Sequence, residues 1–376
     1  MKIIVFDISK GNALGQIRSF GEIGYYPILI MVKDTCYNYV ADSKYVKEAY
    51  NVNSISDGIS LIKKLILEDL SLEEKIFIST GNDGIIAALN ESLISDDRVL
   101  FFNSKHINGL SKFMDKQLLC ELAEQYGLLI PKSEVVEVGS LPQNIKYPIF
   151  TKPLDSFDFH GWKDKEKICR NQNELIEMFF DSNLKGRILL QEYIEKEDEY
   201  VLQGVSINGG KDVYLPIEGG YYRLPDDAYG TYMFFQKFNG NKILYNSIKN
   251  ILKEIQYSGI FEVEFLMEKN TKKLYFLEIN FRHTFINHCF TAMGCNLCKV
   301  WMDSVLKGKL CIEDVCINKE PFIWMNEPED FKRVVMPSKL KLFSWIKDVL
   351  KTDSFVLWNT KDNKPFWNYL RHIIFR

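Results

Sequence analysis

The sequence predicts a parallel α/β domain followed by an α+β region, and three observations lead to this prediction. Over the first hundred residues, short apolar runs alternate with amphipathic helical segments, which is typical of a parallel sheet. Beyond Pro131, several predicted strands alternate apolar and polar residues, as antiparallel strands with one solvated face do. The length of 376 residues is sufficient for two or three domains.

The first predicted domain comprises residues 1–105. Its buried parallel strands are predicted at three apolar runs rich in β-branched residues: Lys2–Asp7, Tyr26–Val32 and Lys75–Ser79. Amphipathic segments between them predict helices at Ala13–Ile23 and Ile59–Leu70. Gly24 lies where the first helix is expected to end.

Two loops of this domain follow predicted strands, at the edge of the sheet where α/β proteins bind ligands. Gly11 and Gly15 follow the first strand, but their spacing is not that of a dinucleotide site. We therefore interpret this loop as a tight turn into a helix. Asn82 and Asp83 follow the third strand and are candidates either for substrate contact or for capping the next helix.

The middle of the chain begins with a helix and continues with strands. The helix is predicted at Gly109–Tyr126, because Gly127 and Pro131 would end it. Gly209-Gly210 between two of the strands indicates a hairpin. The strands are predicted at Ser133–Val138, Tyr147–Pro153, Arg187–Ile194, Tyr200–Ile207, Val213–Glu218, Phe261–Met267 and Lys273–Ile279.

The last two of these strands carry acidic and amide side chains among apolar residues. Glu262 and Glu264 share one face of their strand, and Glu278 and Asn280 share a face of the next. Carboxylates in an apolar strand are costly unless a cation compensates them. Oxygen ligands suit Mg²⁺, which proteins bind together with substrate phosphates, and Arg282 suits phosphate or carboxylate recognition. The alternative is an edge strand with solvated acids.

Five segments, in this order, resemble those of ATP-grasp ligases, and the resemblance covers roughly residues 1–310. The segments are Asp115-Lys116 before a helix, Tyr147–Pro153, Leu190–Ile194, Val263–Phe265 and Leu277–Arg282. The chain is identified as a member of this family on their joint occurrence. The resemblance implies an N-terminal α/β domain (1–105), an ATP-grasp domain (106–310, with subdomains 106–195 and 196–310) and a helical C-terminal extension (311–376).

The resemblance also implies the cofactors, ATP with Mg²⁺ or Mn²⁺, and the residues that bind them. The implied ATP-binding residues are Lys116, Lys152, Gln191, Glu192, Tyr193, Ile194 and Glu199. The implied metal ligands are Glu264, Glu278 and Asn280. The implied catalytic residues are Lys152, Arg223 and Arg282.

Within the family, the pattern resembles carboxylate–amine ligases related to D-aspartate ligase. These enzymes activate a carboxylate as an acylphosphate that an amine then attacks, so small-molecule carboxylate and amine substrates are expected. Arg223 would contact a substrate carboxylate or the transferred phosphate; the alternative is a surface arginine in a loop. Two other functions stay open: a carbamoyl-phosphate-synthase-like phosphorylating chain, and a nucleotide-binding subunit without turnover.

One segment departs from the family pattern. The loop after Lys152 is usually rich in glycine and serine, whereas Leu154–Lys163 contains a single glycine and several bulky residues. Ser156, His160 and Lys163 are candidates for phosphate contact. We expect an unusual lid or slow turnover.

Composition and charge restrict the classes of protein further. A net charge of −3 argues against a nucleic-acid binder. Early polar residues at the N-terminus do not resemble a secretory signal, and no apolar run is long enough to span a membrane. Eight cysteines in so long a chain are expected to be reduced thiols, so a cytoplasmic location is predicted. Cys295 and Cys298 fit a buried helix face better than a zinc site.

The C-terminal extension differs from the rest of the chain in charge. Residues 331–376 contain ten Lys or Arg and three Asp or Glu, giving +7, so residues 1–330 carry −10. Basic residues interleaved with Trp and Phe suit peripheral contact with an anionic membrane or a lipid-linked precursor. The favoured alternative is a helical cap on the ligase domain or a contact between the two copies of a homodimer.

Overall fold

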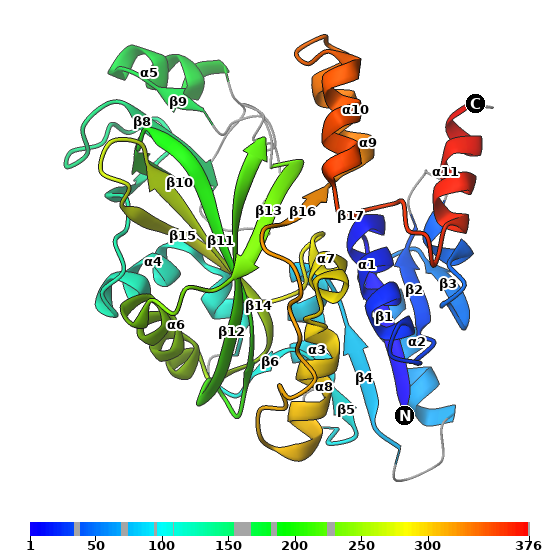
Figure 1. Cartoon of the computed structure of the whole chain (residues 1–376). Coiled ribbons are helices and arrows are strands. Elements are labelled where there is room, and N and C mark those ends of the chain that lie inside the picture. Colours follow the sequence, from blue (N-terminus) through cyan, green and yellow to red (C-terminus); the bar gives the residue numbers. More distant parts are fainter. Residues whose placement is uncertain are drawn as a thin grey trace.

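The computed structural model describes residues 1–33, 38–68, 74–93, 96–107, 109–153, 167–181, 186–223 and 230–374, which form three sheets with flanking helices (Figure 1). The first sheet is parallel, in the order β3-β2-β1-β4-β5, which confirms the predicted α/β domain. Its strands are β1 (Lys2–Asp7), β2 (Ile28–Val32), β3 (Glu48–Val52), β4 (Ile76–Ser79) and β5 (Val99–Leu100). Its helices are α1 (Lys10–Gly21), α2 (Ile55–Glu68) and α3 (Asp83–Leu93).

Both faces of this parallel sheet are covered, because successive side chains of a strand point to opposite sides. Ile4 and Phe6 of β1 pack in the core that contains α2 and α3. Ile3 and Val5 pack in the core that contains α1 and continues into the rest of the molecule. Burial on both sides explains why the central strands are apolar without alternation.

The second sheet is antiparallel, with the order β7-β10-β8-β9, and α5 packs against it. The elements of this subdomain are β7 (Ser133–Glu137), β8 (Ile149–Pro153), β9 (Ile168–Cys169), α5 (Gln172–Asp181) and β10 (Arg187–Glu192). The predicted helix Gly109–Tyr126 that leads into it is divided into a 3₁₀ turn, η2 (Ser111–Met114), and α4 (Lys116–Gln125). The division occurs because Asp115 is extended and its carboxylate accepts a hydrogen bond from the Leu118 N–H.

The third sheet is the largest and has the order β15-β14-β11-β12-β13-β16-β17, with β6 beside β14. Gly209 and Gly210 adopt positive φ angles between β11 and β12, as the predicted hairpin requires. The strands are β6 (Asn103–Ser104), β11 (Lys196–Ile207), β12 (Asp212–Arg223), β13 (Tyr232–Lys237), β14 (Tyr257–Glu268), β15 (Leu274–Asn280), β16 (Phe322–Met325) and β17 (Ser354–Phe355). The helices are α6 (Lys242–Ile255), α7 (Asn287–Met293) and α8 (Leu297–Lys307).

The C-terminal extension is helical, as predicted, but it also adds β16 and β17 to the third sheet. Its helices are α9 (Glu327–Asp330), α10 (Leu342–Lys351) and α11 (Lys364–Ile374), with a π-helical turn, η3 (Phe331–Val335), after α9. Helix α11 lies against the 3₁₀ turn η1 (Tyr39–Asp42) of the first domain, where the rings of Tyr39 and Tyr369 meet edge to face at 5.5 Å. Among the described residues, no helix is long and apolar enough to cross a membrane.

A buried ion pair fastens the C-terminal extension to helix α1. Arg18 Nε lies 3.0 Å from Asp362 Oδ2, and neither side chain is exposed. The same guanidinium donates hydrogen bonds to the carbonyl oxygens of Val356, Leu357 and Asp362. Asp362 also accepts hydrogen bonds from the Ser43 hydroxyl and the Lys44 N–H. Both charges are therefore satisfied by several partners, as buried charges must be.

Glu327 at the start of α9 stabilises the same segment from the other side. Its carboxylate accepts hydrogen bonds from the backbone N–H groups of Val356, Leu357 and Trp358. Burial nevertheless raises the pKa of Glu327 to about 7, although these hydrogen bonds and the charge of Arg18 oppose the shift.

The raised pKa of Glu327 predicts that stability falls as the pH rises from about 4.5 to about 7. In this window the unfolded chain releases the proton while the folded chain keeps it, so ionisation favours unfolding. At neutral pH the raised pKa of Glu327 lowers the free energy of unfolding by about 3 kcal/mol relative to acidic pH, since each pKa unit corresponds to about 1.4 kcal/mol. Denaturant unfolding of the wild type and of Glu327→Gln should show a smaller decrease for the variant across this window. Parallel pH profiles would contradict the prediction.

Candidate active site

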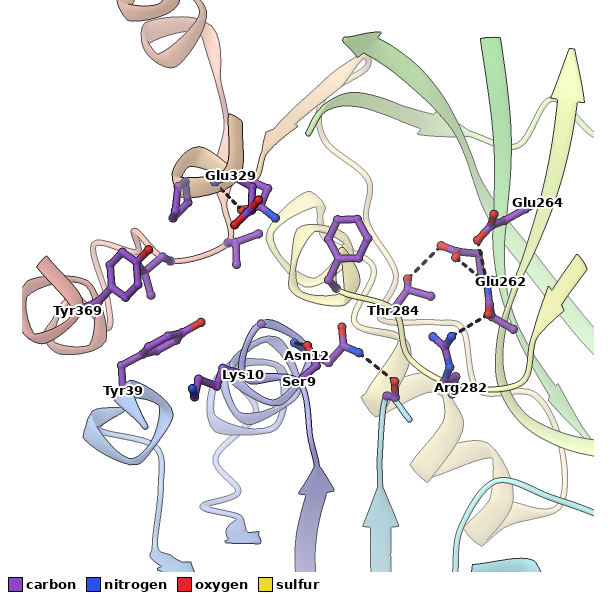
Figure 2. Close-up of a pocket in the computed structure, with 18 of the residues that line it drawn as sticks. Ser9, Lys10, Asn12, Tyr39, Glu262, Glu264, Arg282, Thr284, Glu329 and Tyr369 are labelled. Carbon is purple, nitrogen blue, oxygen red and sulfur yellow. Dashed lines mark hydrogen bonds between the residues drawn. The ribbon is translucent and has the colours of Figure 1, made fainter. Parts of the chain in front are cut away.

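A cavity of about 760 Å³ lies where the first domain, the third sheet and the C-terminal extension meet (Figure 2). In Figure 2, Glu262, Glu264 and Arg282 stand on one side of it, and Tyr39 and Tyr369 stand on the other. Further lining residues are Ser9, Lys10, Gly11, Asn12, Gly81, Glu278, Asn280, Thr284, Phe285, Asn326, Pro328, Glu329, Val356, Leu357, His372 and Ile373. Three distant parts of the sequence thus contribute to one cavity.

The acidic side chains predicted on the two strands lie together at this cavity. In the register of β14 and β15, Glu264 is opposite Glu278 and Glu262 is opposite Asn280. The Asn280 amide donates to Glu264 at 2.8 Å and to Glu262 at 3.3 Å. Glu262 also accepts hydrogen bonds from Gln203 and from the Thr284 hydroxyl. Sequence reasoning placed Glu262 on the face of Glu264 but did not include it among the ligands.

The electrostatics of this cluster fit a bound cation. Burial and the neighbouring charges of Glu278 and Glu262 raise the pKa of Glu264 well above its ordinary value. Burial likewise raises the pKa of Glu262. A divalent cation would relieve both effects. No three His, Cys, Asp or Glu side chains in the described ranges are arranged to hold a metal, and Mg²⁺ at nucleotide sites takes one or two carboxylates together with phosphates.

Two lysines lie in the second sheet and in the helix that leads into it. Lys116, the first residue of α4, has its Nζ 3.7 Å from Glu278. Lys152 of β8 lies over the Phe150 ring, 5.6 Å from its centre. The pKa of the buried Cys120 thiol, raised to about 11 by burial, is also affected by the charges of Lys152, Glu278 and Lys116. All three charged groups thus lie near Cys120, and lysines beside a carboxylate are residue types that a polyanion site with a metal uses.

Arg282 is held in a fixed position by residues of two domains. Its Nε donates to Asp83 of α3 at 2.8 Å, and a terminal nitrogen donates to Asn280 at 2.9 Å. Asp83, which the sequence offered as a substrate contact or a cap, is thus a partner of Arg282. The pair ties the first domain to the carboxylate cluster and presents a guanidinium to the cavity.

Two loops of the first domain at the base of the cavity are organised by Asp7. Its carboxylate accepts hydrogen bonds from the N–H groups of Ile8, Ser9 and Gly81 and from the Gln16 amide. Burial raises the pKa of Asp7 to about 6, although these hydrogen bonds lower it. The loop after β1, which Asp7 organises, places Ser9, Lys10 and Asn12 at the cavity. Sequence reasoning did not name these three residues as site residues, because single polar residues after a strand carry no distinctive pattern.

The predicted adenine and ribose residues lie at the join of β10 and β11. Gln191 is buried, the Glu192 N–H donates to the Lys132 carbonyl, and the Tyr193 N–H donates to the Pro148 carbonyl. Ile194 follows in the same connection, and Glu199 accepts a hydrogen bond from Lys196. None of these residues lines the cavity described above, and their roles stay predictions. Ser156, His160 and Lys163 lie outside the described residues.

Arg223 has other partners than those proposed from the sequence. Its guanidinium forms ion pairs with the buried Asp330 and with Asp348, and it lies over the Tyr232 ring at 5.0 Å. It does not line the cavity. The structure thus places this arginine beside α9 and α10 of the C-terminal extension.

The cysteine and histidine residues near α7 and α8 are buried. Cys298 Sγ lies 3.5 Å from His283 Nε2, and His288 Nε2 lies 2.9 Å from Glu22. Burial raises the pKa of Cys295 to about 12. These features agree with packing as the role of Cys295 and Cys298.

The chain is similar in sequence to two characterised relatives, although no protein-family model matches it. It is 22% identical over 298 residues to the carbamoyl phosphate synthase large chain of Saccharolobus solfataricus, covering 73% of this chain and 28% of that protein. It is 22% identical over 241 residues to D-aspartate ligase of Enterococcus faecium, covering 58% of this chain and 56% of that protein. The chain thus spans about a quarter and about half of these relatives.

Solved structures show the same architecture. N5-carboxyaminoimidazole synthetase of Staphylococcus aureus superimposes with a TM-score of 0.64 at 14% identity, over 90% of this chain and 85% of that chain. L-amino acid ligase of Bacillus licheniformis gives a TM-score of 0.56 at 13% identity, over 82% of this chain and 74% of that chain. The biotin carboxylase domain of Hydrogenobacter thermophilus 2-oxoglutarate carboxylase was solved with MgADP and bicarbonate. It gives a TM-score of 0.59 at 20% identity, over 84% of this chain and 72% of that chain. The chain therefore has the ATP-grasp fold, as its sequence predicted.

Proposed function

We propose that the chain is an ATP- and Mg²⁺-dependent ligase that activates a carboxylate as an acylphosphate and transfers the acyl group to an amine. The observation that carries this proposal is the set of Glu262, Glu264 and Glu278 on paired strands, facing a cavity that also reaches the first domain. Lys116 lies 3.7 Å from Glu278, and the charges of Lys116, Lys152 and Glu278 all act on the thiol of Cys120. A relative named D-aspartate ligase and neighbours solved with ADP or MgADP support the assignment of this region to nucleotide and metal.

The residues around the carboxylate cluster fit Mg²⁺, and Mn²⁺ has the same preference for oxygen ligands. Glu264, Glu278 and Asn280 would hold the metal, with Glu262 orienting Asn280 through its hydrogen bond. When bound, the metal neutralises charge on the β- and γ-phosphates. The pKa of Glu264 is raised in the free chain, and a bound cation would favour its ionised form.

The remaining charged groups would stabilise the transfer. A substrate carboxylate oxygen attacks the γ-phosphorus, the bond to the β–γ bridging oxygen breaks, and ADP leaves. Lys116 and Lys152 would hold the phosphates, while Arg282, fixed by Asp83, faces the charge that develops on the transferred group. The amine nitrogen then attacks the acyl carbon, the bond to phosphate breaks, and the amine gives up a proton.

A second candidate function is phosphorylation of bicarbonate or carbamate. It is favoured by the similarity to a carbamoyl phosphate synthase chain and by the neighbour solved with bicarbonate. The cytoplasmic location and a homodimer are proposals that rest on the sequence; the biotin carboxylase neighbour was solved as a dimer.

The test is ADP release with Mg²⁺ and ATP over a panel of amino-acid pairs, compared with bicarbonate and ammonia. Release that requires two amino acids, with a peptide product found by mass spectrometry, supports the ligase. Release with bicarbonate supports the second candidate. Measurable ATP binding without ADP release under any condition contradicts both and indicates a nucleotide-binding subunit.

A further inference from the structure

Helix α10 carries an apolar face that no other described part of the chain covers. Its apolar residues recur with helical spacing on one side, and none of its residues is buried. Phe343 is 81% exposed and Leu350 is 80% exposed, which is unusual for two large apolar side chains two helical turns apart on one face. The outer face of α10 consists of Leu342, Phe343, Ile346 and Leu350.

The opposite side of α10 is firmly attached to the protein. The Trp345 ring meets Phe331 edge to face at 5.1 Å, and its Nε1–H donates to the buried Asp330 at 2.8 Å. Asp348 pairs with Arg223 at the end of β12. In Figure 1, α10 projects from the body above β16. These contacts fix which side of the helix points outward, so the exposure of the outer face is built into the fold.

Four lysines lie on α10 or directly before it. Two lie on the helix and two precede it, and all four are exposed: Lys339, Lys341, Lys347 and Lys351. Within the described ranges none of the four forms an ion pair, and the single acid of the helix, Asp348, is already paired with Arg223. The surface therefore combines large apolar side chains with an uncompensated positive rim.

We propose that α10 docks in the plane of an anionic membrane surface, with its outer face in the lipid boundary and its lysines on the headgroups. Amphipathic helices with apolar and lysine-rich sides bind membranes in this way, and lysine stems extend along apolar surface to reach phosphates. A second copy of the chain is a poorer fit, because the cores of protein interfaces are depleted in lysine. Pro328 and Glu329 of α9 line the cavity, so docking holds the cavity near the lipid surface.

The experiment is sedimentation of the full chain with vesicles of phosphatidylcholine alone or mixed in equal parts with phosphatidylglycerol. We expect binding to the anionic vesicles that weakens with salt. Phe343→Gln/Leu350→Gln should weaken this binding by at least roughly tenfold, since the two large apolar side chains would no longer be buried in the lipid boundary. The matched control is Phe180→Gln/Ile243→Gln, which changes side chains that are 85% and 75% exposed on α5 and α6.

Three results would overturn the proposal. The first is no binding of the wild type to anionic vesicles, and the second is equal loss in both double variants. The third is a wild-type dimer that Phe343→Gln/Leu350→Gln converts to a monomer without any vesicle binding, which would assign the face to a second copy. Lys347→Glu/Lys351→Glu provides an independent test, because it should reduce binding to anionic vesicles while the apolar face is unchanged. None of these measurements uses ligase activity.

Discussion

Glu278→Gln is expected to reduce Mg²⁺-dependent ADP release by at least roughly a hundredfold, the usual effect of removing one group that stabilises developing charge. Glu278 faces Glu264 across the two strands and lies 3.7 Å from Lys116, so its charge would act on the proposed metal and on the lysine proposed to bind phosphate. The amide keeps the shape of the side chain but removes that charge. The measurement is initial rate against Mg²⁺ concentration, together with ATP binding by calorimetry.

The control for this variant is Glu313→Gln, which changes an exposed carboxylate that does not line the cavity. The control should keep wild-type turnover and thermal stability. Glu278→Gln should also fold, because removing one of several neighbouring negative charges relieves repulsion. Turnover of Glu278→Gln within a fewfold of wild type would exclude Glu278 as a metal ligand.

Arg18→Met is expected to cost about 3–5 kcal/mol of unfolding free energy, because it leaves Asp362 charged and buried without its partner. The loss should also release the segment that contains Val356 and Leu357, whose carbonyls the guanidinium binds. Equilibrium denaturation measures the first effect. Limited proteolysis near Asp362 measures the second, since the wild-type segment is protected by its packing on α1.

Two further variants make this prediction specific. Arg98→Met breaks a pair with Asp96 whose side chains are 29% and 31% exposed, and it should cost less than about 1 kcal/mol. Arg18→Met/Asp362→Leu replaces both charges by apolar groups and should recover part of the loss. If Arg18→Met proves no more destabilising than Arg98→Met, the pair does not anchor the extension.

The sequence predicted those elements whose pattern is local. Strands β1, β2 and β4 have continuous apolar runs because both faces of the sheet are covered, and that signal needs no knowledge of partners. Glu264 and Glu278 could be found because acids within apolar strands are unusual in any sequence. In contrast, β16 has four residues and β17 has two. Such strands are too short for an alternation of apolar and polar residues to be recognised in the sequence.

The partners of charged residues could not be predicted, because they are distant in the chain. Arg223 suggested a substrate contact, but its partner Asp330 is 107 residues away and only the folded sheet brings them together. Tyr369 and His372, which line the cavity, were not predicted as site residues for the same reason. Sequence reasoning offered a cap on the ligase domain, a homodimer contact or a membrane contact for the basic aromatic extension. In the structure α11 packs on η1 of the first domain and α10 exposes an apolar face, and the membrane contact stays a proposal.

The buried ion pair between Arg18 and Asp362 can form only after both residues have been synthesised. The two residues are 344 positions apart, so the ribosome makes the first long before the second. Until Asp362 emerges, the nascent first domain presents a guanidinium and one side of α1 that have no partner from the extension. Strands β14 and β15, which carry the carboxylate cluster, can pair by then. The side of the cavity that Tyr369 lines has not yet been made. A chain interrupted before this point would lack the side of the cavity that Tyr369 and His372 line, so the cavity is complete only once the extension has been synthesised.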